Sequence, residues 1–539
     1  MDEVRVKPYG WHERGDEMSH FDVIVIGSGF GGSVSALRLS EKGYKVLVIE
    51  KGKRFAPGDF PTSNWDVKRW MWRPEVGLQG IFQMSFLKHV TVMHGVGVGG
   101  GSLTYANTLP TPTDKFFEAS SWSQLADWKK ELLPHYETAK KYLGAARNPV
   151  KTRGDEVLQE IARDMKREEH FHMADVGVFF GQPGTSVKDP YFGGKGPDRT
   201  GCTFCGACMT GCRVGAKNTL DRNYLYLAEQ LGAQVISETE VHHVAPRGEG
   251  GYRVDVAPSL QKGEAGHFTA DKVIFAGGVM GTIPLLLAMR EAGLPNLSAR
   301  VGDAVRTNSE ALCAVVVPDS NINLSKGVAI TSILHTDEHS HIEPVRYAAG
   351  SGFFRTLMLP QASGPTALTR MAGAMRGVLR DPVKWAKAYA VSDFAKQSQI
   401  LLYMRTLEGT LSMRLGRGLH TGFRRGLITQ VDNPQDAPRA DMPEALELAS
   451  RFADKVGGVA ATLLTETLLG VPSTAHILGG AGMGQHAGNG VIDSQHRVFG
   501  YEGLYVIDGS AVSANPGVNP SLTITALAER AMSFFPAKQ

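Results

Sequence analysis

Two short apolar segments, separated by a glycine-rich turn and a helical segment, constrain the fold of this chain most strongly. Residues 21–26 (Phe-Asp-Val-Ile-Val-Ile) form a run typical of a strand buried on both faces. The turn Gly-Ser-Gly-Phe-Gly-Gly occupies 27–32, residues 33–41 show helical spacing, and residues 44–50 form a second apolar run. This order of strand, G-x-G-x-x-G turn, helix and strand is the context in which the motif binds a dinucleotide.

Each glycine of the motif has its own role. Gly27 permits the tight turn, Gly29 lets the backbone approach a pyrophosphate, and Gly32 lets the helix pack closely on the strand. The free N–H groups at the start of the helix attract the same pyrophosphate. Glu50 ends the second strand, where its carboxylate is placed to accept hydrogen bonds from a ribose diol. The motif therefore predicts a dinucleotide site at these four residues.

Four of the five cysteines lie in one window, with the spacing C-x2-C-x2-C-x3-C. This spacing is the iron–sulfur run of bacterial ferredoxins, so the first hypothesis is a [4Fe–4S] or [3Fe–4S] cluster held by Cys202, Cys205, Cys208 and Cys212. Zinc is a second hypothesis, although structural zinc sites usually separate two cysteine pairs more widely. A packing role without metal is the third. Cys313 is an alternative source of a fourth thiolate.

Composition excludes several classes of protein. The formal net charge of +3 is too small to suggest nucleic-acid binding, and no base-reading module is recognisable. Bunched cysteines do not form a disulfide framework and suit a reducing compartment. The N-terminus lacks the apolar core of a signal peptide, and no apolar run reaches the length of a membrane span. A soluble, cytoplasmic protein is therefore expected.

Several ordered blocks of the sequence resemble one family, the glucose–methanol–choline (GMC) flavoenzymes, and specifically their cholesterol-oxidase-like branch. The blocks are the fingerprint at 21–50, the glycine-rich loop at 94–107, and the C-terminal segments 475–480, 504–510, 517–520 and 523–530. The resemblance implies non-covalent FAD. It also implies that His476 and Asn519 face the flavin on the substrate side. The residues that it implies for contact with FAD are Gly101, Asn107, Asp508 and Gly509.

The expected fold class is α/β, with a Rossmann-type FAD-binding domain and an α+β substrate domain built on an antiparallel sheet. Apolar runs at 272–276 and 503–507 add further buried strands to the first domain. The predicted segments are an N-terminal arm at 1–20, FAD-binding segments at 21–112, 196–310 and 466–539, and substrate-domain segments at 113–195 and 311–465.

The expected reaction is oxidation of the secondary hydroxyl of a bulky apolar alcohol to the ketone. The resemblance points to a 3β-hydroxysteroid such as cholesterol, with O2 or an external acceptor. A neutral His476 suits general-base work near neutral pH, and Asn519 can orient the hydroxyl. Asn519 is also predicted to cap a helix that Pro520 begins and that runs to about Ser533. The positive end of this helix would then face the flavin.

Two other functions stay open. One is a GMC dehydrogenase that acts on a sugar or long-chain alkanol and passes electrons through the cysteine-bound cluster. The other is a redox sensor without turnover. The glutamate with which sterol enzymes move the steroid double bond has no matched position, although Glu343 lies nearby out of register.

Residues 365–390 form a basic stripe with apolar residues at helical spacing. The cations are Arg370, Arg376, Arg380, Lys384 and Lys387, against the single acid Asp381. The apolar residues are Leu368, Met371, Met375, Val378 and Leu379, followed by Trp385. A basic amphipathic helix can lie on an anionic membrane, which suggests peripheral membrane contact. The alternative is an ordinary surface helix packed on its own domain.

Overall fold

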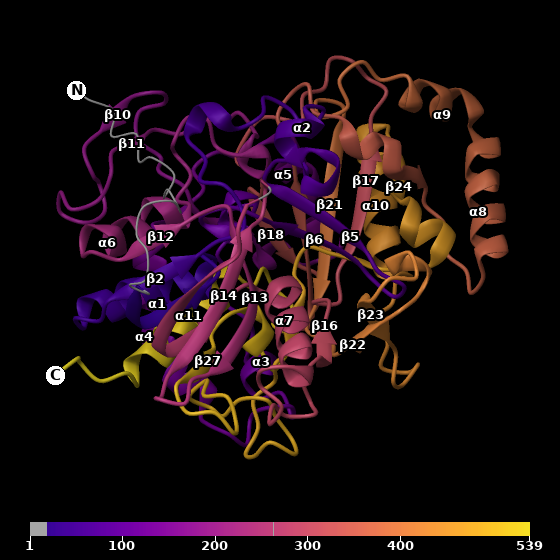
Figure 1. Cartoon of the computed structure of the whole chain (residues 1–539). Helices are drawn as coiled ribbons and strands as arrows, with labels where there is room; N and C mark the ends of the chain where they lie inside the picture. Colours follow the sequence, from indigo (N-terminus) through magenta and orange to yellow (C-terminus); the bar gives the residue numbers. More distant parts are fainter. Residues whose placement is uncertain (1–18, 262) are drawn as a thin grey trace.

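The computed structural model describes residues 19–261 and 263–539 of the chain (Figure 1). Most of the predicted N-terminal arm at 1–20 therefore lies outside the described residues. Two large sheets and the helices packed on them make up most of the fold, which confirms the predicted α/β class with a second, antiparallel sheet. None of the helices in these two described ranges has the length and apolar character needed to cross a membrane.

The first sheet carries the predicted dinucleotide motif. Its strands are β1 (His20–Ile26), β2 (Val46–Ile49), β12 (Gln234–Ile236), β13 (Thr239–Pro246), β14 (Tyr252–Pro258), β15 (Gly266–Phe275) and β27 (Leu504–Val506). The order is β12-β2-β1-β15-β14-β13, and β27 also pairs with β15. The strands β12, β2, β1, β15 and β27 run parallel, whereas β14 and β13 form an antiparallel edge.

Strand β15 joins the two parts of this sheet. Its first half pairs with β14 between residues 266 and 270, and its last three residues pair with β27. The sheet thus combines strands from the beginning, the middle and the end of the chain. The boundaries of the predicted domain segments stay a prediction.

Helices cover one face of the first sheet. Helix α1 (Phe30–Glu41) contacts α6 (Tyr224–Gln230) and α11 (Ser521–Ser533), and α11 contacts α4 (Trp128–Tyr142), which follows the short α3 (Asp114–Phe117). Nε of Arg38 on α1 lies 2.7 Å from a carboxylate oxygen of Glu529 on α11, and this carboxylate also accepts the hydroxyl hydrogen of Tyr224 at 2.7 Å. A buried ion pair with an added hydrogen bond fixes α11 against α1, because either charge alone would be left desolvated.

A second group of elements packs beside the antiparallel edge. It comprises α7 (Val279–Glu291) and the small antiparallel sheet of β16 (Asp303–Arg306), β22 (Thr410–Gly416), β23 (Gly426–Gln430) and β26 (Leu478–Gly480).

Short elements elsewhere in the chain complete the fold. They are α2 (Val67–Trp70), β3 (Trp72–Arg73), β4 (Leu78–Gln79), β5 (Phe82–Phe86), β6 (Thr91–Gly95), β7 (Ala145–Arg147), β9 (Asp175–Gly177), β10 (Ser186–Val187), β11 (Arg199–Thr200) and β25 (Ser473–Thr474).

The second large sheet is entirely antiparallel. Its order is β20-β24-β17-β21-β19-β18-β8. The strands are β8 (Phe171–Met173), β17 (Ala311–Val316), β18 (Ser332–His335), β19 (Ser340–Val345), β20 (Met358–Pro360), β21 (Ser398–Arg405) and β24 (Val459–Leu463). Because side chains alternate along a strand, Leu401 and Tyr403 of β21 join one core with α5 (Arg153–Asp164) and α10 (Pro443–Val456), whereas Ile400 and Leu402 face a cavity.

The basic stripe forms two helices rather than one. Helix α8 (Ala367–Arg380) ends at Asp381, and α9 (Pro382–Tyr389) begins with the following proline. Proline disfavours helical backbone at the preceding residue, so it breaks the predicted stripe at this point. Both helices lie at the edge of the molecule, at the right of Figure 1.

Candidate active site

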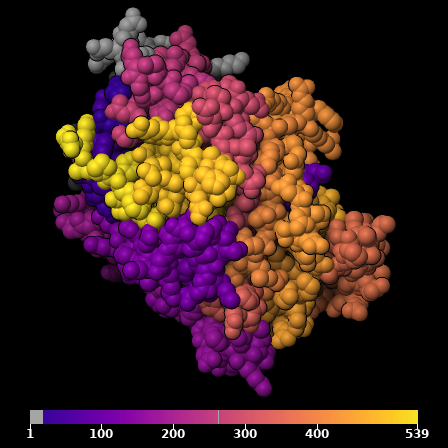
Figure 2. Space-filling view, turned by 90° about the horizontal axis from the view of Figure 1, so that it is seen from below, coloured from indigo at the N-terminus to yellow at the C-terminus, as the bar shows by residue number. Residues whose placement is uncertain are grey.

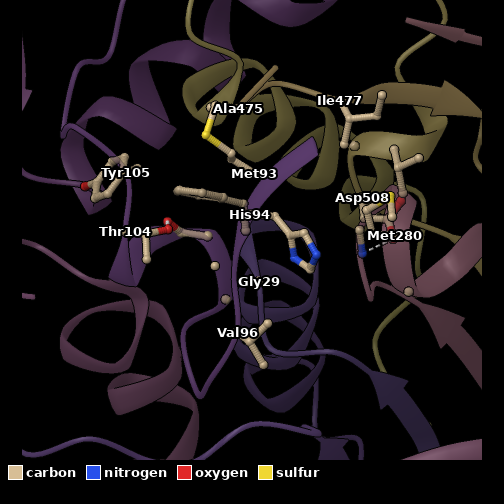
Figure 3. Close-up of a pocket in the computed structure, with 18 of the residues that line it drawn as sticks. Gly29, Met93, His94, Val96, Thr104, Tyr105, Met280, Ala475, Ile477 and Asp508 are labelled. Atoms are coloured by element: carbon tan, nitrogen blue, oxygen red, sulfur yellow. Dashed lines mark hydrogen bonds between the residues drawn. The ribbon is translucent and has the colours of Figure 1, made fainter. Parts of the chain in front are cut away.

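A cavity of about 570 Å³ lies between the first sheet and the second large sheet, which is antiparallel. Residues at the ends of β1, β2 and β15 line one part, and side chains of β17, β21 and β24 line another. Figure 3 shows part of the wall, with Gly29, His94 and Asp508 on different elements around the same space. Residues predicted to bind the cofactor and residues predicted to be catalytic therefore share one cavity.

The glycines of the fingerprint separate into two kinds. A Cβ atom on Gly27 would lie 2.4 Å from the carbonyl oxygen of Ala276, and one on Gly32 would lie 2.0 Å from that of Gly27. These two glycines are required by the fold itself. A Cβ on Gly29 would have no closer neighbour than Ala276 O at 4.0 Å. Because Gly29 lines the cavity, its lack of a side chain leaves room for a ligand rather than for the chain.

Glu50 holds the glycine turn in place. One carboxylate oxygen accepts hydrogen bonds from Ser28 N at 3.2 Å and Ser28 Oγ at 2.7 Å, and the other accepts one from Gly52 N at 2.8 Å. The carboxylate is buried and lines the cavity, where its remaining lone pairs can face a ribose. The structure thus places Glu50 beside the turn, and its contact with a ribose stays a prediction.

The glycine-rich loop stacks on the fingerprint turn. Residues Gly100–Leu103 form a single 3-10 turn, and a Cβ on Gly100 would lie 2.6 Å from the Cα of Gly29. Gly101 lines the cavity. Asn107 is fully buried, and in the described part of the chain its amide has no hydrogen-bond partner of ordinary geometry. Its neighbours Ala106 and Thr108 line the cavity, whereas Asn107 lies behind this wall.

The C-terminal segment supplies the opposite wall. Asp508 accepts hydrogen bonds from Gly278 N at 2.8 Å and Thr282 Oγ1 at 2.6 Å, so it ties β27 to the start of α7. Burial raises the pKa of Asp508, although the hydrogen bonds from Ser510 and Thr282 act in the opposite direction. Asp508 and Gly509 both line the cavity. Together with an uncapped α1 N-terminus, an open Gly29 and a fixed Glu50, this wall fits the FAD that the fingerprint implies.

His476 is held by a glutamate that the sequence did not single out. Nδ1 of His476 lies 2.5 Å from Oε2 of Glu310, whose other oxygen accepts the backbone N–H of Ala475. Glu310 is fully buried. Burial lowers the pKa of His476, but the charges of Glu310 and Glu343 outweigh it and raise the pKa above its usual value. The bond at Nδ1 leaves Nε2 free for a ligand.

Asn519 lies at the cavity wall and bonds to the glutamate that was out of register in the sequence. Its Nδ2 donates to Oε2 of Glu343 at 3.2 Å, and within the described residues its Oδ1 has no partner. Oε1 of Glu343 lies 3.2 Å from Nε2 of His341. The prediction that Asn519 caps the last helix is wrong, because α11 begins at Ser521 and the Asn519 amide turns to Glu343 instead.

His94 is a further cavity residue that the sequence did not assign to a role. Figure 3 shows its imidazole pointing into the space between Gly29 and Asp508. Burial lowers the pKa of His94 to about 3, helped by the charge of Lys51, so the ring is neutral at physiological pH. Its Nε2 is buried and has no partner in the described ranges. A buried polar atom of this kind is expected to bind a ligand atom.

One part of the cavity wall is mainly apolar. Its side chains are Phe82, Met93, Leu312, Ile330, Val345, Tyr347, Phe354, Met358, Ile400, Leu402 and Leu463. Most of them come from β5, β6 and the large antiparallel sheet, whereas Ile330 and Tyr347 lie beside its strands and Phe354 lies in a 3-10 turn. The polar atoms of His476 and Asn519 thus share one cavity with a wall that favours a bulky apolar molecule.

The cysteine run lies against the glycine-rich loop but does not form the predicted metal site. The buried ammonium of Lys217 donates to the carbonyl oxygens of Cys208 at 2.8 Å and Leu103 at 2.9 Å, and the next residue, Met209, lines the cavity. Across the described residues, no three His, Cys, Asp or Glu side chains are arranged to hold a metal ion, and all five cysteines are free. An iron–sulfur cluster or zinc ion on these four thiols is therefore not supported, because ligands must converge on one point. Cys313 is buried in the separate core under α10, with its Sγ 3.8 Å from the carbonyl oxygen of Ala445.

Glu310 could not be assigned from sequence because its partner lies 166 residues away. One weak signal existed: it is a lone acid directly before the apolar strand 311–316. The acid is brought to His476 by long-range packing of β16, β17 and β25, which no local pattern reveals.

Comparison with known proteins assigns the same segments to one family. Two sequence models described as GMC oxidoreductase match residues 196–306 and 431–528, and one described as FAD binding domain matches residues 22–58. A cholesterol oxidase of Mycobacterium tuberculosis (strain ATCC 25618 / H37Rv) is 44% identical over 96% of this chain and 91% of its own length. A cholesterol oxidase of Acinetobacter baumannii is 41% identical over 96% of this chain and 95% of its own length.

More distant proteins share the fold. A long-chain-alcohol oxidase of Arabidopsis thaliana is 26% identical over 94% of this chain and 66% of its own length. The crystal structure of pyridoxine 4-oxidase from Mesorbium loti superposes with a TM-score of 0.60 at 14% identity, covering 95% of this chain and 99% of that one. At this identity the likeness concerns the fold alone.

Proposed function

Because the chain belongs to the GMC oxidoreductase family and is an FAD-dependent alcohol oxidoreductase, we propose that it oxidises the secondary hydroxyl of a steroid to the ketone. The expected substrate is a 3β-hydroxysteroid such as cholesterol, the class named for the two relatives above 40% identity. The observation that carries the proposal is the pairing of His476 and Asn519 with the apolar side chains of the large antiparallel sheet that line the same cavity. A rigid apolar molecule with one hydroxyl matches both features.

The apolar wall argues against a sugar. Each hydroxyl of a sugar that enters such a cavity would lose its water without gaining a partner, which costs about 1–3 kcal/mol per group. Aromatic rings add to the apolar wall: Phe82 stacks on Trp70 with the ring centroids 4.6 Å apart, and Phe354 meets Phe82 edge to face. These flat surfaces favour fused rings over a flexible chain, since a long-chain alkanol would lose more conformational entropy on binding.

His476 is assigned as the general base. Glu310 accepts the Nδ1 hydrogen, so Nε2 carries the lone pair that takes the proton of the substrate hydroxyl. The imidazolium that results is stabilised by Glu310 and Glu343, whose charges raise the pKa of His476. When bound, FAD supplies the acceptor for the hydride from the carbinol carbon.

Asn519 is assigned to orientation of the substrate. Glu343 fixes the amide nitrogen, which leaves the second amide hydrogen to donate to the substrate oxygen, while the hydroxyl hydrogen of the substrate goes to His476. Two groups directed at one oxygen restrict its rotation, and this restriction keeps the carbinol hydrogen toward the flavin. The first turn of α11 lies at the same wall, because Pro520, Ser521 and Ile524 line the cavity. Its positive end favours negative charge on the cofactor.

Molecular oxygen is the proposed electron acceptor, since both close relatives are named oxidases. The alternative, a dehydrogenase that passes electrons through a cysteine-bound cluster, has no converging ligand set among the described residues to carry it. Peripheral contact with a membrane is proposed as the source of the sterol.

One experiment tests the proposal. The purified holoenzyme is mixed anaerobically with cholesterol in cyclodextrin, with glucose, or with a long-chain alkanol, and flavin bleaching is followed. We expect bleaching with cholesterol at a rate at least tenfold above the others, and H2O2 release on admission of air. His476→Asn should retain flavin and bleach at least a hundredfold more slowly, the loss expected for a general base. Preferential bleaching by glucose or the alkanol would reject the substrate assignment.

Iron analysis and EPR of the same sample test the acceptor. A stoichiometric cluster signal that appears on substrate addition ([4Fe–4S]) or disappears on it ([3Fe–4S]) would replace O2 by the cluster in this assignment. Flavin absorbance without iron is the expected result.

A further inference from the structure

Helix α8 turns its large apolar side chains to the solvent, whereas an ordinary surface helix turns them to the protein. Leu368, Met375 and Leu379 are 78%, 62% and 73% exposed, and Met371 is also exposed. These four residues are separated by steps of three, four and four, so they lie in one row along the helix. No residue of the helix is fully buried. A row of large apolar side chains in water indicates a missing partner.

The side of α8 that packs on the protein is made of small residues and one arginine. A Cβ on Gly373 would lie 3.2 Å from the Cβ of Ala362, and Val378 packs on the core of the antiparallel sheet. Arg370, which the sequence placed in the basic stripe, instead donates to the carbonyl oxygens of Thr467, Gly364 and Leu468 at 2.7, 2.8 and 3.3 Å. The arginine therefore anchors the helix and does not contribute to its outer surface.

Cations accompany the exposed row. Arg376 and Arg380 follow Met375 and Leu379 on α8, and Lys384 and Lys387 continue onto α9. The acid Asp381 lies between the helices, where its side chain accepts the N–H of Lys384 at 3.0 Å. Helix α9 is fixed to the core by Trp385, which is buried. The pair of helices is thus a rigid apolar surface with a positive border.

We propose that this surface, formed by α8, the start of α9 and the exposed Leu469 beside them, docks on an anionic phospholipid bilayer. An amphipathic helix with cations on its border lies in the interface with its apolar side about 5–10 Å deep in the lipid. A 14-residue helix presents a row about 21 Å long for this purpose. A second copy of the chain is a poorer partner, because two positive borders would meet.

The location of the surface connects it to the cavity. Helix α8 packs against β20, and Met358 of β20 lines the cavity, as does Leu463 of the neighbouring β24. Figure 2 shows the segment as a lobe that projects from the body of the molecule, so a flat bilayer can reach it. Docking on a bilayer would give the enzyme access to an alcohol dissolved in the lipid. The proposed function enters this inference only through the identity of that alcohol.

Vesicle sedimentation of the full holoenzyme tests the docking. Two triple variants are compared with wild type: Leu368→Gln/Met375→Gln/Leu379→Gln, which keeps good helix formers, and Arg376→Gln/Arg380→Gln/Lys387→Gln. The matched controls are Leu231→Gln, directly after α6, and Lys140→Gln/Lys141→Gln, on α4; both helices lie at the opposite side of Figure 1. Vesicles of phosphatidylcholine with and without phosphatidylserine supply the two surfaces.

Wild type and both controls should bind vesicles that contain phosphatidylserine and lose this binding at high salt. Each surface cation contributes about fivefold, so the charge variant should bind on the order of a hundredfold more weakly. The apolar variant should lose at least tenfold on the same vesicles. Circular dichroism and turnover of cholesterol in cyclodextrin should match wild type for both variants, which shows that the fold and the site are intact.

Equal vesicle binding of wild type and both triple variants would overturn the proposal. Equal binding of wild type to vesicles with and without phosphatidylserine would overturn it as well. Concentration-dependent dimers that disappear in the apolar variant, without vesicle binding, would assign the surface to self-association instead. Failure to oxidise cholesterol in cyclodextrin would reject the proposed substrate. The test of docking would still hold, because sedimentation with vesicles does not depend on turnover.

Discussion

Glu310→Gln is the substitution that tests the proposed base most directly. The Glu310 carboxylate is fully buried, and its Oε2 lies 2.5 Å from Nδ1 of His476. Glutamine has nearly the same shape and can still accept the Nδ1 hydrogen through its carbonyl oxygen. The substitution therefore removes the negative charge and keeps the bond to Nδ1, although its NH2 group then replaces the oxygen that accepts the N–H of Ala475.

The magnitude follows from the change in charge on His476 during the reaction. The imidazole is neutral before it takes the substrate proton and positive afterwards, so Glu310 stabilises the later state more. A hydrogen bond to a charged group contributes about 1.5–3 kcal/mol. Glutamine keeps a neutral hydrogen bond that contributes about 0.5–1.5 kcal/mol. At about 1.4 kcal/mol per factor of ten, the difference should slow flavin reduction by about fivefold to about tenfold.

The pH dependence should shift in a defined direction. His476 is active as a base only when deprotonated, and Glu310 raises its pKa, so the wild-type rate should rise with pH through a midpoint above the ordinary histidine value. Glu310→Gln removes the raising charge and should move this midpoint to lower pH. Anaerobic stopped-flow bleaching with cholesterol, repeated from pH 5 to pH 9, measures both effects.

Glu466→Gln is the matched control for this experiment. Glu466 is also buried near Glu310, and burial raises its pKa to about 8, so it is neutral at pH 7 and glutamine imitates it. Its midpoint and rate below pH 7 should equal those of wild type. A Glu310→Gln enzyme with an unshifted midpoint and a rate within twofold of wild type would refute the role given to this carboxylate.

Three further predictions concern the cofactor wall, the substrate amide and stability. Asn519→Asp should slow flavin reduction at least tenfold without loss of flavin, because a second carboxylate would then lie beside Glu343; an unchanged reduction rate would contradict this. Gly29→Ala should fold with a wild-type apoprotein Tm yet lose FAD affinity, whereas Gly31→Ala should fail to fold because its Cβ would lie 1.7 Å from a backbone oxygen; equal FAD titrations for Gly29→Ala and wild type would contradict the ligand role. Glu466→Gln should gain Tm over wild type progressively from pH 5 to pH 8, because the folded protein keeps the Glu466 proton that the unfolded chain releases; a constant Tm difference across this range would contradict the raised pKa.

The dinucleotide motif was predictable because its signals are local. The strand expected at residues 21–26 is β1, the helix expected at 33–41 lies within α1, and the strands expected at 272–276 and 503–507 overlap β15 and β27. Each of these strands is an apolar run with a glycine directly or one residue after it, and a buried parallel strand needs little else. The fold class followed from these runs together with the family resemblance.

The catalytic surroundings were less predictable because they depend on long-range packing. His476 came from the family motif, but Glu310 and the contact between Asn519 and Glu343 join residues more than 160 positions apart. The cysteine run differs in that a local signal found no support. Its spacing matched a ferredoxin, yet among the described residues no three ligating side chains are arranged to hold a metal ion. Sequence spacing constrains which ligands are available, whereas the surrounding fold decides whether they meet.

The pairing of β15 with both β14 and β27 has a consequence for biosynthesis. Residues 504–506 and α11 are synthesised more than 220 residues after β15, so the sheet stays one strand short until then. Asn519 also belongs to this late segment, and His476 is synthesised shortly before it. A nascent chain can present the Gly29 turn to FAD early in translation, but it cannot close the opposite wall. We therefore expect stable flavin binding only after this wall has formed, and C-terminal truncations that remove β27 should yield apoprotein.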